Sequence, residues 1–415
     1  MDRTHVAIVG AGVIGLAVSY HLVRAGLRVT IIDRDPDGDR ASLGNAGAIA
    51  VTEVVPASTP GLAWRVPGWL LDPLGPIAVR VTHLPKLLPW LARFSKVGSA
   101  SEVERISLAL AALNSRVYED LVPMLDAVGL QEDLHRVGSL TVYETESGYQ
   151  RDLAEWELKR RRGIEVRTMT GAEAREMEPA LGPRILRAVF TPEWSHVSDP
   201  KNIVRGLKEW LLARDVIIRS AEVRTIDSFA GSSLRLKAEG GQELSADYVV
   251  VSAGAWSGSL AASLGDRVIL ESERGYNSTL ADCGISVGRT LIFAEKKFVV
   301  TPLGCGLRIG GAAEFGGLNA HPDFRRSRAL EHLAQRFLPG LKTEGGTYWT
   351  GHRPATPDSL PVIGRSNRQP RVFYAFGHGH LGLTQAATTG RLVSDLIAGK
   401  TPPIDLAPYS IDRFR

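Results

Sequence analysis

The sequence predicts an α/β fold with two domains, and three observations lead to this prediction. The chain has 415 residues, which is more than one hydrophobic core usually supports. Its first residues read as a strand, a glycine-rich turn, a helix and a second strand. Further apolar, strand-like runs at 247–254 and 371–376 lie far from this first unit, and glycine-containing turns follow both. One domain should therefore be built on a discontinuous sheet, with the other domain inserted between its segments.

The N-terminal unit carries the most specific signal. Residues 5–9 read as a strand buried on both faces, and a helix follows the glycines and stops at Gly26. Gly10 permits a tight turn, Gly12 allows close approach of a pyrophosphate, and Gly15 allows close helix packing. Asp33 ends the second strand, where it is placed to accept a ribose hydroxyl. The pattern predicts a Rossmann-type dinucleotide site rather than a merely flexible turn.

Composition excludes several classes of protein. The net charge of +4 is spread along the chain, which does not indicate nucleic acid binding. Two cysteines, Cys283 and Cys305, form neither a disulfide framework nor a metal-ligand spacing, so no metal site is expected. The first strand begins near His5 and leaves no room for a signal peptide. We expect a cytoplasmic protein, with a peripheral location on the inner face of the cell membrane as the alternative.

The remaining chain divides into segments of the two domains. Asp199 and Pro200 are typical of a helix start, and the glycine-rich turn at 377–382 leads into another helix that ends at Gly399. Residues 289–313 read as antiparallel strands, and residues 101–104 read as a capping box that opens a helix. The expected Rossmann-type cofactor domain comprises 1–56, 196–262 and 346–415. The expected substrate domain, with a mainly antiparallel sheet, comprises 57–195 and 263–345.

An apolar, basic insert lies at 60–97. Five apolar residues share one face of a predicted helix there: Leu84, Leu87, Leu88, Leu91 and Phe94. Such a face usually packs on a core, which is the reading we favour, and a peripheral membrane contact is the alternative.

Several motifs, taken together and in order, resemble one family over nearly the whole chain. They are GAGVIG at 10–15, GNAGAI at 44–49, VVVSAGAWS at 249–257, GHRPATPDSLPVIGRS at 351–366 and VFYAFGHGHLGLT at 372–384. They resemble the FAD-dependent D-amino acid dehydrogenase family, within the D-amino acid oxidase and glycine oxidase superfamily. The branch that acts on cyclic D-imino acids such as cis-4-hydroxy-D-proline or D-proline is the most similar.

The resemblance implies FAD as cofactor and oxidation of a D-amino or D-imino acid by hydride transfer from Cα to flavin N5. The stretch at 44–49 has no cysteine or histidine, so FAD should be bound non-covalently. A quinone or another carrier is the expected electron acceptor. Two alternatives stay open: a glycine or sarcosine type of oxidase that uses O₂, and a flavin-carrying subunit of a hetero-oligomeric dehydrogenase.

Three residues are expected to carry the chemistry. Arg353 matches the family arginine that binds the substrate carboxylate, and its alternative is a surface pair with Asp358. Tyr276 matches a position that lines the substrate pocket, where its phenol can reach the carboxylate. His380 lies at the turn that faces the flavin, where it can adjoin the substrate amine. Histidines at 196, 352 and 378 receive no role.

The glycine loop and the family motifs together mark the residues expected to contact the cofactor. They are Gly10, Gly12, Val13, Ile14, Gly15, Asp33, Arg34, Ser42, Asn45, Ala46, Gly47, Val223, Ala253, Gly254, Trp256, Gly379, His380, Gly382, Leu383 and Thr384.

Overall fold

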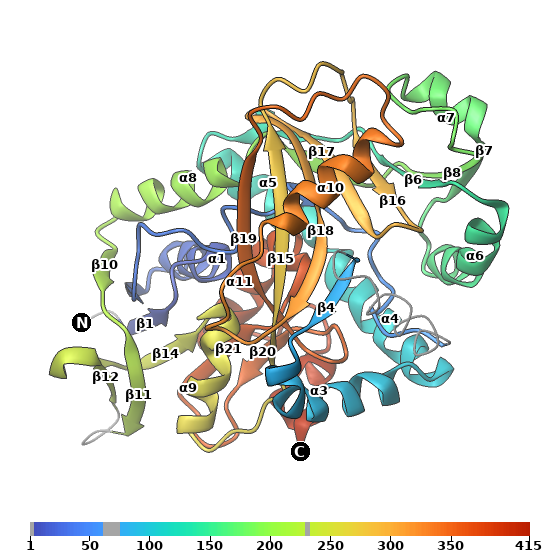
Figure 1. The fold of residues 1–415 in the computed structure, drawn as a ribbon. Helices are drawn as coiled ribbons and strands as arrows, with labels where there is room; N and C mark the ends of the chain where they lie inside the picture. The colour runs from blue at the N-terminus through green and yellow to red at the C-terminus, as the bar shows by residue number, and fades with distance from the viewer. Residues whose placement is uncertain (1–3, 61–74, 229–232) are drawn as a thin grey trace.

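A computed structural model describes residues 4–60, 75–228 and 233–415 (Figure 1). Within these ranges a six-stranded sheet has the order β10-β2-β1-β14-β21-β20. All neighbouring strands are parallel except β20 and β21, which are antiparallel. The strands come from separate parts of the chain, as predicted: β1 (His5–Val9), β2 (Arg28–Asp33), β10 (Ile217–Ser220), β14 (Tyr248–Val251), β20 (Val362–Arg365) and β21 (Val372–Phe376).

The N-terminal strand–helix–strand unit forms as the sequence predicts. All five residues of β1 are buried, because the sheet is covered on both faces. Helix α1 (Val13–Arg24) begins directly after Gly12. Gly26 ends this helix with a φ of +82°, which favours glycine. The parallel pairing of β1 with β2 and β14 places the loop after β1 at the carboxyl edge of the sheet.

The second large sheet is mainly antiparallel. In the described part of the chain it has nine strands in the order β19-β15-β18-β17-β16-β6-β8-β7, with β4 paired to β18. The parallel neighbours are β16 with β6 and β18 with β4. Its strands are β4 (Ile77–Val79), β6 (Ser139–Tyr143), β7 (Arg167–Thr170), β8 (Arg187–Thr191), β15 (Glu271–Leu280), β16 (Thr290–Phe293), β17 (Phe298–Leu303), β18 (Gly306–Phe315) and β19 (Thr347–Ala355).

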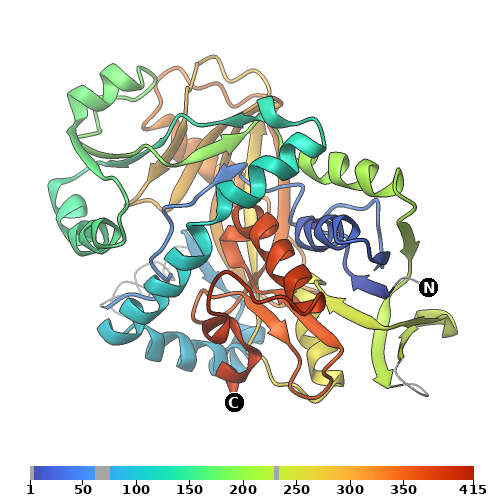
Figure 2. The ribbon, with the colours of Figure 1, turned by 180° about the vertical axis from the view of Figure 1, so that it is seen from behind.

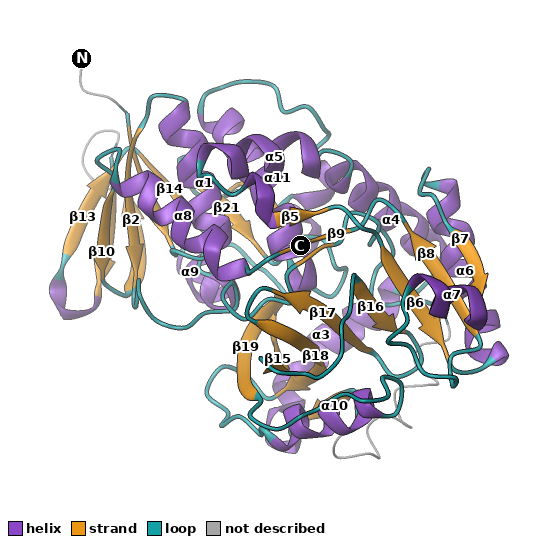
Figure 3. Cartoon of the chain, turned by 90° about the horizontal axis from the view of Figure 1, so that it is seen from above, coloured by secondary structure: helices purple, strands orange, loops and turns teal. Residues whose placement is uncertain are grey.

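Smaller sheets and the remaining helices complete the described fold. In the view from above, α8 and the six-stranded sheet lie on one side, and β6, β7 and β8 with α6 and α7 lie on the other (Figure 3). The smaller strands are β3 (Ala48–Ile49), β5 (Leu134–His135), β9 (Ser195–Val197), β11 (Val223–Ser228), β12 (Leu234–Ala238) and β13 (Glu243–Ala246). The helices are α3 (Leu84–Val97), α4 (Ala100–Asn114), α5 (Val117–Ala127), α6 (Glu146–Arg161), α7 (Gly171–Met177), α8 (Pro200–Leu212), α9 (Ser257–Ser263), α10 (Arg325–Gln335) and α11 (Gly382–Ile397).

Three elements lie across the expected domain boundaries. Strand β19, placed by sequence in the cofactor domain, is the edge strand of the second sheet beside β15. Helices α4 and α5, placed in the substrate domain, pack their apolar residues into the same core as α1 and α11 (Figure 2). An apolar stripe shows that a helix is packed, but not which of two cores receives it.

Local details of the helices also differ from the prediction. The capping box at 101–104 was wrong, because α4 already begins at Ala100 and Ser99 occupies the N-cap position. The sequence also predicts one helix with an apolar stripe at 106–125, whereas the structure divides that stripe between α4 and α5: Ile106, Leu110 and Leu113 lie on α4, and Val117, Leu121 and Leu125 lie on α5. By contrast, the Asp199 side chain accepts a hydrogen bond from the N–H of Lys201 (2.9 Å) and caps α8 as expected.

The insert is partly packed and partly exposed. Residues 61–74 lie outside the described part, while α3 follows as a helix. Leu87 is fully buried beside Trp90 and Phe315, as the packing interpretation expects. Leu84 and Leu88, which the sequence placed on the same face, are 40% and 56% exposed, so only part of the predicted face is packed. Among the described helices, none is both long and apolar enough to cross a bilayer.

Candidate active site

A large cavity joins the two sheets. Its volume is about 2110 Å³, above the roughly 300–1000 Å³ of pockets for drug-sized ligands. One end is lined by the glycine loop after β1, and the other by residues of β15 and β19. The cavity therefore has room for a dinucleotide together with a small substrate.

The glycine loop is shaped so that larger residues do not fit. Gly10 has a φ of +112°, and a Cβ there would lie 2.8 Å from the carbonyl carbon of Ser252 and nearer still to its oxygen. A Cβ at Gly15 would overlap the carbonyl oxygen of Gly10 and lie 2.8 Å from Ser252 Oγ. The first turn of α1 follows directly, and a glycine loop that leads into a helix N-terminus is the arrangement that binds a pyrophosphate. The geometry fits the predicted dinucleotide.

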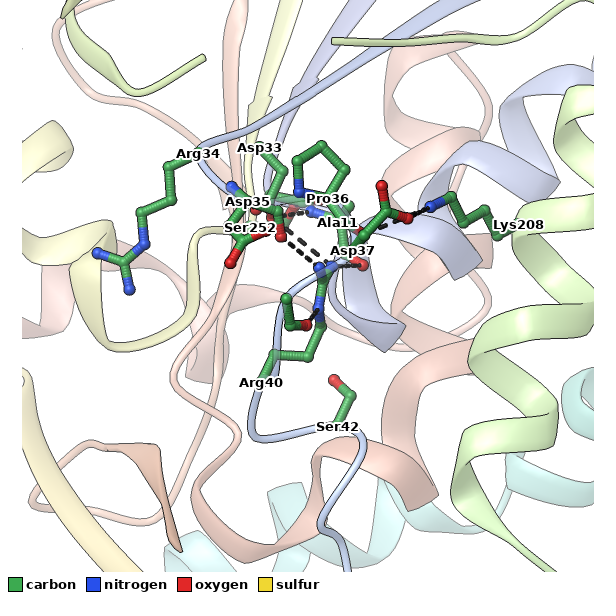
Figure 4. Close-up of polar contacts among 12 residues, drawn as sticks. Ala11, Asp33, Arg34, Asp35, Pro36, Asp37, Arg40, Ser42, Lys208 and Ser252 are labelled. Atoms are coloured by element: carbon green, nitrogen blue, oxygen red, sulfur yellow. Dashed lines mark hydrogen bonds and ion pairs between the residues drawn. The ribbon is translucent and has the colours of Figure 1, made fainter. Parts of the chain in front are cut away.

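Asp33 lies at the end of β2 beside this loop (Figure 4). Its Oδ2 accepts a hydrogen bond from the N–H of Ala11 (2.6 Å), and its Oδ1 accepts one from Asp35 (2.9 Å). Arg40, which the sequence did not single out, donates to the carbonyl oxygens of Ala11 and Asp35, at 2.6 Å each. Lys208 pairs with Asp37 on the same loop. These contacts fix the loop after β2 against the glycine loop, and Asp33 remains accessible from the cavity.

Other residues that were predicted to contact the cofactor line the same end of the cavity as Asp33. Arg34 points away from the Asp33 cluster and stacks on Trp256, with its guanidinium carbon 3.8 Å from the ring centre (Figure 4). Ser42 Oγ accepts from the N–H of Val13 (3.0 Å), so it braces the start of α1. Val223, Ala253 and Gly254 form the adjoining wall.

The loop at 44–47 is held by three residues that the sequence analysis did not single out. Asn277 donates to the carbonyl oxygen of Gly44 (2.8 Å), and Arg308 donates to that of Asn45. The ring of Trp349 lies where a Cβ on Gly44 would be. Asn277 Oδ1 and Trp349 Nε1 are buried without a protein hydrogen-bond partner, and both residues line the cavity. Buried polar atoms rarely stay unpaired, which fits a polar ligand against this loop.

An ionic cluster lies at the other end of the cavity. Arg353 Nη1 is 2.7 Å from Glu273 Oε1, and His380 Nε2 is 3.2 Å from the same oxygen. Burial opposes ionisation of Glu273, but the charges of His380 and Arg353 outweigh it and lower its pKa to about 2. Asp358, the alternative partner of Arg353, pairs instead with Arg413 (2.7 Å). Arg353 is thus a cavity residue and not part of a surface pair with Asp358.

Gly275 and Tyr276 shape the space around Arg353. A Cβ at Gly275 would lie 2.8 Å from Arg353 Nε and nearer still to Cζ, so this glycine makes room for the guanidinium. Tyr276 lines the cavity, but its hydroxyl donates to Glu314 and accepts from the N–H of Asp323. Burial, followed by the bond to Glu314, raises the pKa of Tyr276. The hydroxyl that was expected to reach a substrate carboxylate is therefore bonded to two other protein groups instead.

The three histidines without a predicted role are each in contact with other protein side chains. His378 is buried and bonded to Thr389 (2.9 Å), and burial lowers its pKa to about 3. His352 is bonded to Ser272 (2.6 Å), and burial followed by Arg274 lowers its pKa to about 4. His196 packs on His135, and its pKa is lowered to about 4 by burial and then by that neighbour. All three are neutral at physiological pH.

Most of the predicted cofactor residues line the cavity, and three lie behind its wall. Gly15 packs on the glycine loop, and Gly47 has a φ of +77° that turns the chain after Asn45. Thr384 accepts a hydrogen bond from the N–H of Ala50 (3.0 Å), so it holds β3 and its neighbours rather than facing the cavity.

Glu273 is the principal residue that sequence reasoning missed. It lies two positions before Gly275 on β15, and alternation along a strand puts both on one face. Strict alternation from Tyr276 would have pointed to Arg274 instead, because the register of β15 against β18 shifts between Gly275 and Tyr276. The pairing of Glu273 with Arg353 arises from the register of β15 against β19 and has no local signal.

The fold and site define a protein whose Rossmann-type sheet carries a glycine loop that fits a dinucleotide, and whose second sheet is mainly antiparallel and lines the same cavity. Comparison with known proteins gives the family: the sequence model described as FAD dependent oxidoreductase matches residues 5–396. The chain belongs to this family, and its cofactor is FAD.

Individual relatives match this chain over nearly its full length. The chain is 37% identical to a D-amino-acid oxidase of Bradyrhizobium diazoefficiens, covering 100% of this chain and 99% of the relative. It is 32% identical to a D-amino acid dehydrogenase of Dechloromonas aromatica, with coverage of 96% and 97%. The crystal structure of glycine oxidase from Geobacillus kaustophilus matches with a TM-score of 0.75 and 25% identity, covering 99% of both chains.

Proposed function

We propose that this FAD-dependent oxidoreductase is a D-amino acid dehydrogenase. It would oxidise a D-amino acid to the imino acid, which water converts to a 2-oxo acid and ammonia. A cyclic D-imino acid such as D-proline or cis-4-hydroxy-D-proline would give a cyclic imine. The observation that carries the proposal is that Arg353 lines the same cavity as the glycine loop at Gly10.

The residues of this chain bind and orient the substrate. FAD, when bound, supplies the acceptor for the hydride that leaves Cα. Arg353 has five N–H donors, and only Nη1 is engaged with Glu273, so the guanidinium can also hold a carboxylate through paired bonds. Gly275 keeps the guanidinium in place, since no side chain competes for that volume. Fixing the carboxylate fixes Cα, which is the main contribution a protein makes to such a step.

Support for the substrate class comes from the site together with the relatives. A cationic fork in a cavity of this kind suits a free α-carboxylate. The relatives at 37% and 32% identity are named for activity on D-amino acids. The two names differ in the electron acceptor that they imply, so the acceptor is part of the proposal.

For the acceptor we propose a quinone or another carrier, reached at a membrane surface. Val81, Leu84 and Leu88 are 83%, 40% and 56% exposed on neighbouring turns, with exposed Lys86 and Lys96 on the same helix. Apolar side chains flanked by cations suit the interface of an anionic bilayer. Polarising Leu87, in contrast, would disturb the core, because that residue is fully buried.

An anaerobic screen tests the proposed function. The oxidised holoenzyme is mixed with D-amino acids, their L-enantiomers, D-proline, cis-4-hydroxy-D-proline, glycine, sarcosine and 2-hydroxy acids, and the flavin absorbance is followed. We expect bleaching by D-amino or D-imino acids. Rapid reoxidation in air, equal to that with a quinone analogue, would make the enzyme an oxidase. Bleaching by none of the compounds would indicate a flavin-carrying subunit that needs a partner.

A further inference from the structure

Glu273 is a buried, ionised carboxylate in the wall of the substrate end of the cavity. The residue is 8% exposed, and it faces the cavity rather than a core. Burying a charge is costly unless it is paired, and packing alone would be served better by an apolar residue. A carboxylate at this position therefore calls for a functional explanation.

The charges around Arg353 do not favour a simple carboxylate. Arg353 carries one positive charge, and Glu273, at 2.7 Å, cancels it. His380 meets the same Glu273 oxygen at 3.2 Å, but its side chain is 58% exposed at the rim, where solvent screens its interactions. A ligand with only a carboxylate would leave the buried pair with an unbalanced negative charge, whereas a ligand that also carries an ammonium would balance it.

The positions of the two groups match a zwitterion. Glu273 on β15 and Arg353 on β19 are direct cross-strand partners, so their charged ends share one small region of the wall. The ammonium and the carboxylate of an amino acid are attached to the same carbon. One charge of the ligand can therefore meet each member of the pair, and the Arg353–Glu273 bond need not break, because the guanidinium has further donors.

We propose that Glu273 is a specificity-determining residue that binds the α-ammonium, or the secondary ammonium of a cyclic substrate, and excludes carboxylates that lack an amine. This inference rests on the proposed function, because it requires Arg353 to bind the substrate carboxylate. Its consequence is that the site distinguishes amino acids from plain carboxylic and 2-hydroxy acids by charge rather than by size.

The test compares two probes on one variant, Glu273→Gln, which keeps shape and removes charge. Propionate and D-alanine have nearly the same carbon skeleton and differ in the amine. Propionate binding is followed by its perturbation of the flavin spectrum, and D-alanine binding by the concentration dependence of anaerobic flavin reduction. We expect Glu273→Gln to bind propionate about tenfold more tightly and D-alanine about tenfold more weakly, as loss of a charge-assisted bond implies.

A matched control is Glu331→Gln, another buried glutamate, which bonds Ser278 and Tyr348. It should leave the ratio of the two affinities unchanged. If Glu273→Gln does not retain FAD, Glu273→Asp keeps the charge on a shorter side chain. That variant should still reject propionate while D-alanine binds more weakly.

Affinities that move together, or an unchanged ratio in Glu273→Gln, would overturn the inference. The proposed function is tested separately by Arg353→Lys. If Arg353→Lys loses affinity for both probes while Glu273→Gln changes neither affinity, Arg353 binds the carboxylate but Glu273 does not bind the ammonium. If Arg353→Lys binds both probes normally, Arg353 does not bind the carboxylate.

Discussion

Adding one methyl group at Gly275 should impair catalysis far more than folding. The new Cβ would lie 2.8 Å from Arg353 Nε and closer to Cζ, so the guanidinium must move. It can do so, because it is the far end of a flexible side chain. Overpacking typically costs about 1–3 kcal/mol, and replacing a strand glycine by alanine returns roughly 0.5–1 kcal/mol. The net loss in the free energy of unfolding should therefore lie between about 0 and 2.5 kcal/mol.

The catalytic effect follows from the displacement of Arg353. A misplacement of about 1 Å in a positioning group can lower the rate about a hundredfold. Gly275→Ala should therefore lower kcat/KM for a free D-amino acid by roughly that factor while FAD stays bound. The assay is anaerobic flavin reduction at several substrate concentrations, together with the FAD content and the thermal midpoint.

Gly258→Ala provides the matched control. Its Cβ would meet neighbours no closer than 3.8 Å, so the same methyl group enters ordinary contact distance. This variant should behave as the unmodified enzyme does. Flavin reduction by Gly275→Ala at the unmodified rate, or an equal loss of activity in both alanine variants, would show that Gly275 does not make room for the guanidinium of Arg353.

Three further predictions concern the cofactor, pH and the exposed part of α3. FAD should leave the chain on denaturation by heat or acid, and flavin absorbance that stays with the denatured polypeptide would contradict this. The pKa values of His196, His352 and His378 are lowered in the folded chain, so on acidification the unfolded chain binds protons at a higher pH than the folded chain does. Their contribution to stability is therefore complete above about pH 6.5 and is lost as the pH falls toward 4. Each should lower the free energy of unfolding by up to about 1.4 kcal/mol per pH unit in that window, and denaturant melts that coincide at pH 7.5 and 4.5 would exclude it. Leu88→Ser should weaken binding to anionic vesicles about tenfold without changing the thermal midpoint. Leu212→Ser, which alters a similarly exposed leucine on α8, should change neither vesicle binding nor the thermal midpoint. Equal binding by the two variants would exclude α3 as the membrane contact.

The sequence predicted those parts of the fold whose signals are local. The unit around Gly10 was readable because strand, turn, helix and Asp33 follow one another within about thirty residues. The helix start at Asp199 was readable for the same reason. The capping box at 101–104 was wrong because the helix already begins at Ala100, with Ser99 in the N-cap position and no capping bond from its side chain.

What the sequence left open depends on pairings between distant strands. The Arg353–Glu273 pair exists because β19 and β15 lie in register, and the two residues are far apart in the chain. The supports of the loop at 44–47, Asn277 and Trp349, come from the same two strands. Tyr276 was singled out for its position, but its hydroxyl is bonded to Glu314 on β18, which no local pattern indicates.

Binding of a D-amino acid carboxylate by Arg353 can be tested by comparing two substrates on two forms of the enzyme. The rate of anaerobic flavin reduction is measured for the unmodified enzyme and for Arg353→Lys, each with a free D-amino acid and with its amide. Removing one partner of a hydrogen-bonded charge pair costs about 2–5 kcal/mol, which is roughly thirtyfold to several thousandfold in kcat/KM. We expect a loss of this size for the acid and a small change for the amide, with FAD retained. Reduction of Arg353→Lys by the free acid at nearly the unmodified rate would show that Arg353 does not bind the carboxylate.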